Sequence, residues 1–392
     1  MKITKIVPFC VFSFRTNFVF VKVETDEGIS GVGEGTLEYK EHALLGAIQD
    51  IERVLIGKDP MQAEKITHEL YRDSYWRVGP VLQSAISAVE MALWDIKGKR
   101  YGIPVYELLG GKVREEIRMY ANGWFSGAKE PDEFAEAAKK AVAKGVTALK
   151  WDPFGKSYME LGRKEFTHAM DVVAAVRDAV GRDVDLMIEG HGRFDVATGI
   201  RIAQALKPYD PMFFEEPTPP DCLDALAEVH RKSPVPISAG ERIYSVMQFR
   251  EFLDKGCADF AQPDVSHCGG IMAVKEMAAM AKTHYVAMAP HNPSGPVANA
   301  AALQLAGCLT NYRILEIMYT DVDWRKELTD EHVVFHEGCI RIPDKPGLGL
   351  ELCEEACLAH PFEPVDLRHY KGTLTNIRPA GRTAFYFEGI ES

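Results

Sequence analysis

The stretch Asp185-Leu-Met-Ile-Glu-Gly-His-Gly-Arg193 is the starting point for inferring the fold, because its first residues predict a short apolar strand that ends at Glu189. Two later apolar runs have the same ending. Met212-Phe-Phe-Glu215 closes in a glutamate, and Pro236-Ile-Ser238 is followed by Glu241. The three glutamates are spaced by 26 residues, which accommodates one strand, one helix and their loops. This spacing predicts a parallel sheet built of βα units.

The same alternation of short apolar strands and amphipathic helices begins at Ile117. The helix expected from Pro131 illustrates it, because its apolar residues share one face and Gly145 ends it. Polar residues at or just beyond the strand ends recur every 23 to 27 residues, which places eight strands in about 200 residues. We therefore expect an α/β fold with a modified (β/α)8-type TIM barrel over residues 116–325.

The remaining residues predict a second structural unit. Phe18 to Glu24 is a β-branched and aromatic run closed by turn residues, so residues 3–35 are expected to form antiparallel strands. Apolar residues at helical spacing follow from Leu82 to Arg100. These patterns predict a small α+β domain at residues 1–115, to which the C-terminal segment 326–392 is expected to return.

Composition and charge exclude several classes of protein. The chain has 392 residues, of which 46% are hydrophobic and 26% charged, as in soluble globular proteins. No apolar run approaches the roughly 18 residues of a membrane helix. Eight scattered cysteines suit reduced thiols, and a net charge of -12 disfavours nucleic acid. We expect a cytoplasmic protein that binds neither membrane nor nucleic acid and forms a homo-oligomer of a size that the sequence does not fix.

Three carboxylates are expected to converge above the barrel. Active sites of such barrels form at the C-terminal ends of the strands, which is where Glu189, Glu215 and Glu241 fall. Three anions in one place repel one another unless a cation lies between them. Oxygen ligands suit Mg²⁺ or Mn²⁺ better than zinc. A single glutamate would more simply pair with a lysine or arginine, but three in register favour a shared metal ion, with Glu216 as a supporting neighbour.

Two histidines near strand ends are candidates for proton transfer. If the strands ending in Asp264 and His291 face each other, the carboxylate accepts a hydrogen bond from one imidazole nitrogen and leaves the other as a base. The simpler alternative for His291 is a hydrogen-bonded core residue. His191 lies two residues after Glu189, so on an extended backbone both would point to the same side. It is the candidate general acid, and its alternative role is a contact beside the metal ligands.

Three further polar residues are candidates for substrate binding. Lys150 and Asp152 alternate at the second strand, and Glu316 closes the eighth. Their positions allow hydrogen bonds to a bound polyol or carboxylate. A structural salt bridge is an open alternative for Asp152.

These motifs, in this order, resemble those of the enolase superfamily, and within it the mandelate racemase-like branch of sugar acid dehydratases. The resemblance runs over essentially the whole chain, and its first hundred or so residues resemble the capping domain of the family. The most specific segments are Ile188-Glu-Gly-His-Gly-Arg193, Phe214-Glu-Glu-Pro217, Ala239-Gly-Glu-Arg242, Gln262-Pro-Asp-Val-Ser-His267 and Ala289-Pro-His-Asn292.

The resemblance implies a role for each candidate residue. It implies a base formed by His291 with Asp264, an acid at His191, a Glu316 that steadies the enolate, and Mg²⁺ held by the ligands Glu189, Glu215 and Glu241. The implied reaction is dehydration of a sugar acid such as D-galactonate or D-gluconate. The C2 proton and the C3 hydroxyl are lost, and a 2-keto-3-deoxy acid forms.

The chain departs from the pattern of the branch at two positions. Racemases of this branch have Lys-x-Lys where this chain has Lys150-Trp151-Asp152, so the usual second base is absent and a one-base reaction is favoured. Glu189 stands where aspartate is commoner. An epimerase or cycloisomerase working through the same enediolate is the main alternative, and an inactive barrel is a remote one.

The sequence does not fix the sugar acid. We expect specificity to come from capping-domain loops at Arg15 to Phe18 and Tyr39 to Glu41, with Trp76 and Arg77 as further candidates.

Overall fold

The N-terminal part of the chain forms an antiparallel sheet covered by helices. The computed structural model describes residues 1–379. In it the strands pair in the order β1 (Ile3–Phe12), β2 (Asn17–Thr25) and β3 (Ser30–Glu34). Glycines in β3 let a helix lie close, since a side chain at Gly33 would collide with a backbone carbonyl of α3. The helices of this part are α1 (Glu41–Leu55), α2 (Ala63–Asp73), α3 (Pro80–Tyr101) and α4 (Val105–Leu108).

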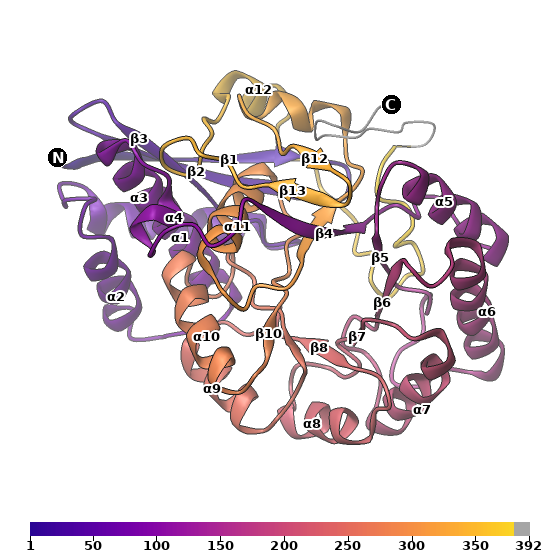
Figure 1. Cartoon of the computed structure of the whole chain (residues 1–392). Helices are drawn as coiled ribbons and strands as arrows, with labels where there is room; N and C mark the ends of the chain where they lie inside the picture. The colour runs from indigo at the N-terminus through magenta and orange to yellow at the C-terminus, as the bar shows by residue number, and fades with distance from the viewer. Residues whose placement is uncertain (380–392) are drawn as a thin grey trace.

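The following residues form a closed barrel of parallel strands, seen end-on in Figure 1. Neighbouring strands pair in chain order, and the last strand pairs with the first. Backbone hydrogen bonds from Met288 to Asn311 and from Arg313 to Met288 close the remaining gap. The strands are β4 (Glu116–Asn122), β5 (Ala148–Trp151), β6 (Asp185–Glu189), β7 (Phe213–Glu215), β8 (Ile237–Ala239), β9 (Phe260–Ala261), β10 (Ala287–Met288) and β11 (Leu315–Met318).

Helices surround the barrel (Figure 1). Each of the strands β4 to β10 is followed by one, and a short 3-10 helix, η1 (Lys207–Tyr209), extends one of them. Apolar and aromatic side chains fill the barrel interior, among them Tyr120, Met187 and Phe213. The helices are α5 (Pro131–Ala143), α6 (Arg163–Val180), α7 (Val196–Leu206), α8 (Leu223–Lys232), α9 (Val246–Asp254), α10 (Ile271–Thr283) and α11 (Pro296–Cys308).

The predicted fold class, a modified TIM barrel with an N-terminal α+β capping domain, is confirmed. Within residues 1–379 the modification is that no helix packs on the barrel after β11. The chain forms η2 (Asp323–Glu327) and then a hairpin of β12 (Phe335–His336) and β13 (Cys339–Arg341), which pairs antiparallel with β4. The described residues include no helix that is both long and apolar enough to cross a bilayer.

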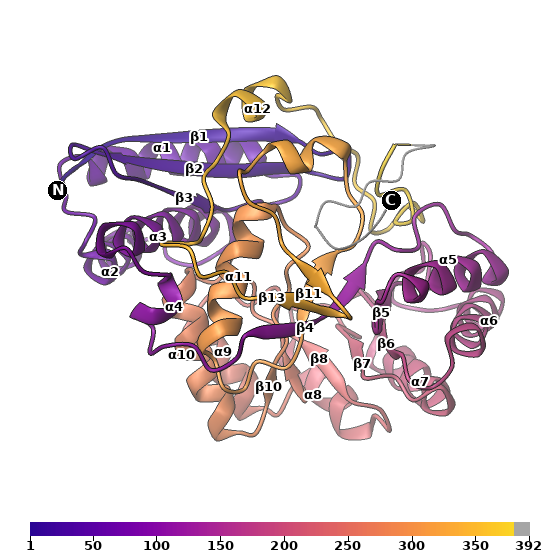
Figure 2. The same cartoon turned by 45° about the horizontal axis from the view of Figure 1, so that its top comes forward.

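The C-terminal segment serves both parts of the molecule. Its hairpin extends the barrel sheet, whereas α12 (Glu354–Ala359) packs on β1, and the backbone amide of Phe12 donates to His360. Figure 2 shows α12 beside the capping sheet, on one side of the barrel. Residues 380–392 of the predicted segment 326–392 lie outside the described residues.

Two buried carboxylates join the capping domain to the barrel. Glu34 accepts hydrogen bonds from the backbone amides of Gly295 (2.6 Å) and Ala298 (2.8 Å) at the start of α11. Glu90 does the same for Ile271 (2.7 Å) and Met272 (3.0 Å) at the start of α10. The amino ends of helices present unpaired N–H groups and a partial positive charge, so both contacts fix the cap on the barrel.

A third buried carboxylate, Asp95 on α3, ties the C-terminal segment to the cap. It accepts from the backbone amides of Val32 (2.9 Å) and Leu348 (2.8 Å) and pairs with Lys99 (2.8 Å). We expect Asp95→Asn to lower the free energy of unfolding by about 3 to 5 kcal/mol, because it breaks a buried ion pair and places an amide against a backbone donor. Urea unfolding measures this. The matched control is Asp50→Asn, an exposed partner of Arg53 that should change stability by less than about 1 kcal/mol.

Candidate active site

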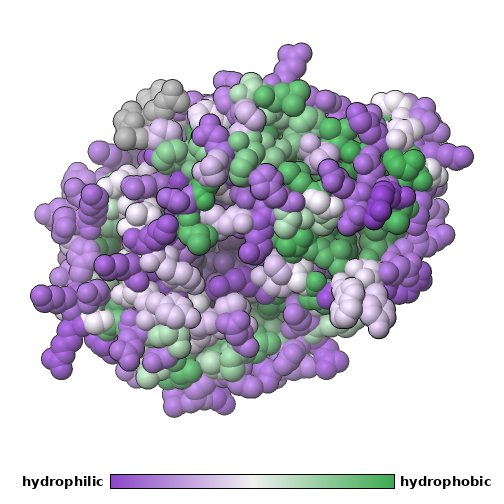
Figure 3. Space-filling model, turned by 180° about the vertical axis from the view of Figure 1, so that it is seen from behind, coloured by the Kyte–Doolittle hydropathy of each residue, from purple (hydrophilic) through white to green (hydrophobic). Residues whose placement is uncertain are grey.

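A cavity of about 780 Å³ lies over the C-terminal ends of the barrel strands. Residues of the barrel, of the capping domain and of the C-terminal segment line it, so all three parts of the chain form its wall. The face opposite to the one seen in Figure 1 is hollowed near its centre, and hydrophilic side chains surround much of the hollow (Figure 3). The volume suits a small molecule.

Glu189, Glu215 and Glu241 meet at one side of this cavity, as the spacing predicts. One oxygen of each lies within 4.8 Å of the others. Glu189 and Glu215 end β6 and β7, whereas Glu241 lies two residues beyond β8, after Gly240. Gly240 has a φ of 135°, and a side chain there would come within 3.0 Å of the backbone nitrogen of Gln262. A glycine is therefore required for the turn that brings Glu241 to the other two.

Lys150 supplies positive charge to this group. Its Nζ lies 2.8 Å from Glu215, 2.9 Å from Glu316 and 3.3 Å from Glu189. Burial alone lowers the pKa of a lysine, but the carboxylates of Glu215 and Glu316 outweigh burial and raise the pKa of Lys150 well above its ordinary value. Lys150 is therefore a fixed cation beneath the three glutamates.

One positive charge does not satisfy the cluster. Oε2 of Glu215 is buried and accepts no hydrogen bond from the described residues. Burial and the charge of Glu189 raise the pKa of Glu215 well above its ordinary value. Hard oxygen donors with an unpaired buried oxygen among them fit a divalent cation such as Mg²⁺.

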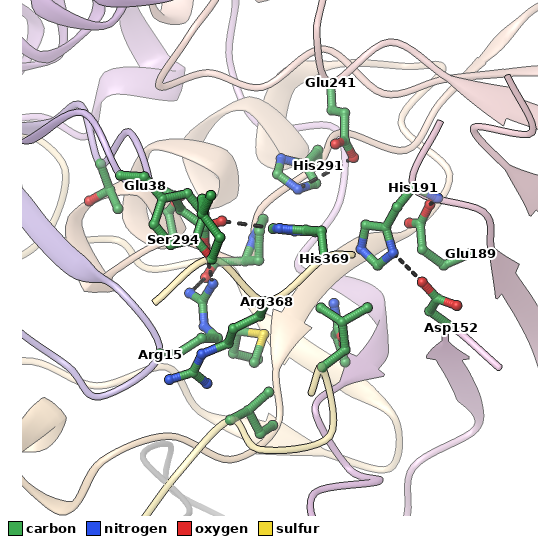
Figure 4. Close-up of a pocket in the computed structure, with 18 of the residues that line it drawn as sticks. Arg15, Glu38, Asp152, Glu189, His191, Glu241, His291, Ser294, Arg368 and His369 are labelled. Atoms are coloured by element: carbon green, nitrogen blue, oxygen red, sulfur yellow. Dashed lines mark hydrogen bonds and ion pairs between the residues drawn. The ribbon is translucent and has the colours of Figure 1, made fainter. Parts of the chain in front are cut away.

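His291 lies beside Glu241 (Figure 4), and Asp264 binds its other ring nitrogen. Its Nδ1 is 2.7 Å from Asp264, and its Nε2 faces Glu241 at 3.5 Å. Burial disfavours the charged imidazole, but Glu241 and Asp264 outweigh burial and raise the pKa of His291 to about 10. The backbone amide of Ser266 donates to the other oxygen of Asp264 (2.7 Å), which fixes that carboxylate. The structure thus places the predicted histidine and aspartate in contact.

His191 is held by a second aspartate. Its Nδ1 is 2.6 Å from Asp152, which also receives Arg193 at 2.5 Å and the backbone amide of Phe154 at 2.8 Å. The expected extended backbone at this point is wrong, because His191 has a φ of 50° and its amide donates to Glu189 (2.6 Å). This turn still directs the imidazole into the cavity.

Glu316 contacts three donors and lies deeper than expected. β11 continues two residues past it to Met318, so Glu316 does not close the strand. Its carboxylate accepts from Lys150, from the Asn122 side chain (2.9 Å) and from the Asn292 backbone (2.9 Å). Burial opposes the charge, but Lys150 and His291 hold the pKa of Glu316 below its ordinary value.

Several cavity residues were not predicted. The C-terminal segment contributes Arg368, His369 and their neighbours, although no strand or helix pattern marks this stretch. Of the expected specificity loops, Arg15 and Tyr39 line the cavity, but Trp76 and Arg77 are not among its lining residues. Trp76 is exposed on the surface instead.

Families of known proteins match both parts of this architecture. Residues 8–110 match the N-terminal domain of mandelate racemase and muconate lactonizing enzyme, and residues 133–356 match the enolase C-terminal domain-like family. The chain belongs to the enolase superfamily. The resemblance found in the sequence motifs is thereby confirmed.

Curated relatives cover most of the chain. A D-galactonate dehydratase of Variovorax paradoxus is 36% identical over 376 residues, which are 94% of this chain and 97% of the relative. A D-gluconate dehydratase of Thermoproteus tenax is 35% identical over 352 residues, 89% of this chain and 71% of the relative. The predicted class of enzyme, a hydro-lyase of this superfamily, is confirmed at this level.

Solved structures agree in fold. A member of the enolase superfamily from Salmonella Typhimurium superposes with a TM-score of 0.88 at 34% identity and covers 92% of this chain and 98% of its own. A mandelate racemase/muconate lactonizing enzyme from Jannaschia sp. CCS1 gives a TM-score of 0.88 at 32% identity. The match covers 94% of this chain and 100% of that structure.

The ion pairs of Lys150 predict how its replacement changes the free energy of unfolding. Lys150→Met removes the lysine that pairs with Glu189, Glu215 and Glu316 at once, so we expect the free energy of unfolding in metal-free buffer to fall by about 3 to 5 kcal/mol. Lys139→Met is the matched control, since Lys139 pairs with Glu136 on the exposed face of α5. Urea unfolding of both variants in EDTA measures the difference, and equal stabilities would contradict the charge-neutralising role.

Proposed function

We propose that this protein is a Mg²⁺-dependent dehydratase of a sugar acid, an aldonate such as D-galactonate or D-gluconate. The observation that carries the proposal is the placement of two histidine–aspartate pairs in one cavity beside three converging carboxylates. The names of the relatives support the substrate class.

Glu189, Glu215 and Glu241 are the residues that would hold the metal ion. When bound, Mg²⁺ supplies Lewis acid chemistry to the substrate carboxylate, whose charge grows as the C2 proton leaves. Lys150 pairs with Glu189 and Glu215 and thereby fixes their orientation, while Glu316 pairs with the same lysine.

His291 is the proposed base that removes the C2 proton. Asp264 binds its Nδ1, which leaves Nε2 as the reactive nitrogen facing the cavity. Glu241 lies 3.5 Å from this nitrogen and, against the effect of burial, raises the pKa of His291, so compensation of the Glu241 charge favours the neutral imidazole that a base requires.

His191 is the proposed acid that protonates the departing C3 hydroxyl. Asp152 binds it and is itself held by Arg193, so Asp152 acts on the reaction through His191 rather than by binding substrate directly. The product is an enol that tautomerises to the 2-keto-3-deoxy acid.

Epimerisation is the second candidate reaction, and the position of residue 152 argues against it. A second base would have to approach the opposite face of C2 from there. Asp152 is instead buried, and Arg193 and His191 occupy its oxygens.

Removal of one ligand charge tests the metal site without an activity assay. We expect wild-type protein to gain about 2.7 kcal/mol of stability when Mg²⁺ is present at 100 times its Kd. Glu241→Gln should lose most of this gain at the same Mg²⁺ concentration, because one of three anionic ligands is removed. Glu355→Gln, on the exposed surface of α12, is the control and should keep it. A full gain in Glu241→Gln would exclude the proposed ligand set.

Replacement of each of the two histidines should block a different step of the reaction. His291→Asn should lose both dehydration and deuterium exchange at C2, by roughly 10² to 10⁴ in rate. His191→Asn should lose dehydration but still exchange the C2 proton, because the acid acts only when the hydroxyl leaves. NMR of the sugar acid in D₂O measures exchange, and a 2-keto acid assay measures product.

Undiminished dehydration by His191→Asn would contradict its role as the acid. Loss of both activities in that variant would show that proton removal and departure of the hydroxyl are one step.

A further inference from the structure

Glu38 and His369 come from distant parts of the chain and meet in the cavity wall (Figure 4). Glu38 lies in the loop after β3 of the capping domain, and His369 lies in the C-terminal segment beyond α12. Figure 4 shows His369 between Glu38 and His191, with its imidazole directed toward Glu38.

The two side chains approach without completing a hydrogen bond. His369 Nε2 lies 4.0 Å from Oε2 of Glu38, which is beyond hydrogen-bond range. The other carboxylate oxygen, Oε1, is held by Arg15 at 2.6 Å. One oxygen and one ring nitrogen are therefore positioned to contact a third polar group.

We propose that Glu38 and His369 together bind a hydroxyl group on the distal carbon chain of the sugar acid, away from C2 and C3. This inference rests on the proposed function and adds to it a pair of residues that select chain length. A hydroxyl can donate to Glu38 and accept from His369, so it satisfies both groups at once.

The charge of the pair favours a hydroxyl over a second carboxylate. Burial raises the pKa of Glu38, but the charge of Arg15 and of other cationic groups outweighs burial and lowers it, so this group is an anion at neutral pH. Burial and His191 lower the pKa of His369, which leaves its imidazole neutral. A distal carboxylate at this position would be repelled by Glu38, whereas the terminal part of an aldonate carries only hydroxyl groups.

Both residues are fixed before substrate binds. Arg193 donates to the backbone carbonyl of His369 (3.1 Å), and the His369 ring packs edge-on against His191 with centroids 5.0 Å apart. Arg15 holds Glu38 and also bonds the carbonyl of Pro293. Such preorganisation lowers the entropy lost on binding. Since Arg193 also holds Asp152, the distal contact is linked to the position of His191.

Comparing substrates of different length tests the proposal. In wild-type enzyme kcat/KM should be higher for a six-carbon aldonate than for the four-carbon 2,3,4-trihydroxy acid, which lacks carbons 5 and 6 and their hydroxyl groups. Glu38→Gln and His369→Asn should each reduce this ratio at least tenfold, as expected for loss of a hydrogen bond to a buried hydroxyl. The controls on the same segment are Glu363→Gln and His360→Asn, which lie outside the cavity lining and should leave the ratio unchanged.

The other possible outcomes each contradict either this proposal or the proposed function. An unchanged ratio in both cavity variants, or an equal loss with both acids, would overturn the proposal in favour of a structural role. Equal kcat/KM for the intact six-carbon aldonate and for its 4,5,6-trideoxy analogue, which has no distal hydroxyl group, would overturn the assigned hydroxyl. If wild-type enzyme with Mg²⁺ dehydrated neither acid, the proposed function itself would fail, and the failure would be visible before any variant is made.

Discussion

Repulsion among carboxylates is the constraint on which the site depends. Glu189, Glu215 and Glu241 place oxygens within 4.8 Å of one another in a largely buried position, and Glu316 lies beside them on Lys150. Such a group is stable only with compensating positive charge. Within the protein Lys150 pairs with Glu215, Glu316 and Glu189, and Glu241 has His291 at 3.5 Å and Arg242 at 4.0 Å. A divalent cation is the further positive charge that we propose. An acidic chain with a net charge of -12 can in this way bind an anionic substrate at one place.

The two histidine–aspartate pairs divide the proposed chemistry between them. Asp264 and Asp152 each bind Nδ1 of a histidine, so in both pairs Nε2 is the nitrogen available to the cavity. Their settings differ, because His291 contacts the ligand Glu241, whereas Asp152 is shared with the buried Arg193. Asp152 therefore positions the residue proposed as the acid.

The sequence predicts the barrel well because strand ends and helix lengths repeat locally, and the three glutamates follow directly from that repeat. It predicts their neighbours less well. His191 adopts a positive φ that no residue pattern reveals, and Glu316 lies inside its strand rather than at the end. His369 could not be found, because contacts with Arg193 and the capping loop place it, and neither contact leaves a periodic signal. Local sequence patterns thus predict which residues lie at the strand ends. Contacts between distant segments determine which residues form the cavity wall around His369.

That wall has a consequence for how the cavity is enclosed. Glu38 and His369 lie on opposite sides of the barrel in chain order, so pairing of the barrel strands alone brings the glutamates together but does not bring these two residues together. The cavity is complete only when the residues around His369 pack on the capping loop that holds Glu38 and Tyr39. A change in the C-terminal segment can therefore open the cavity while it leaves the barrel and its carboxylate cluster intact.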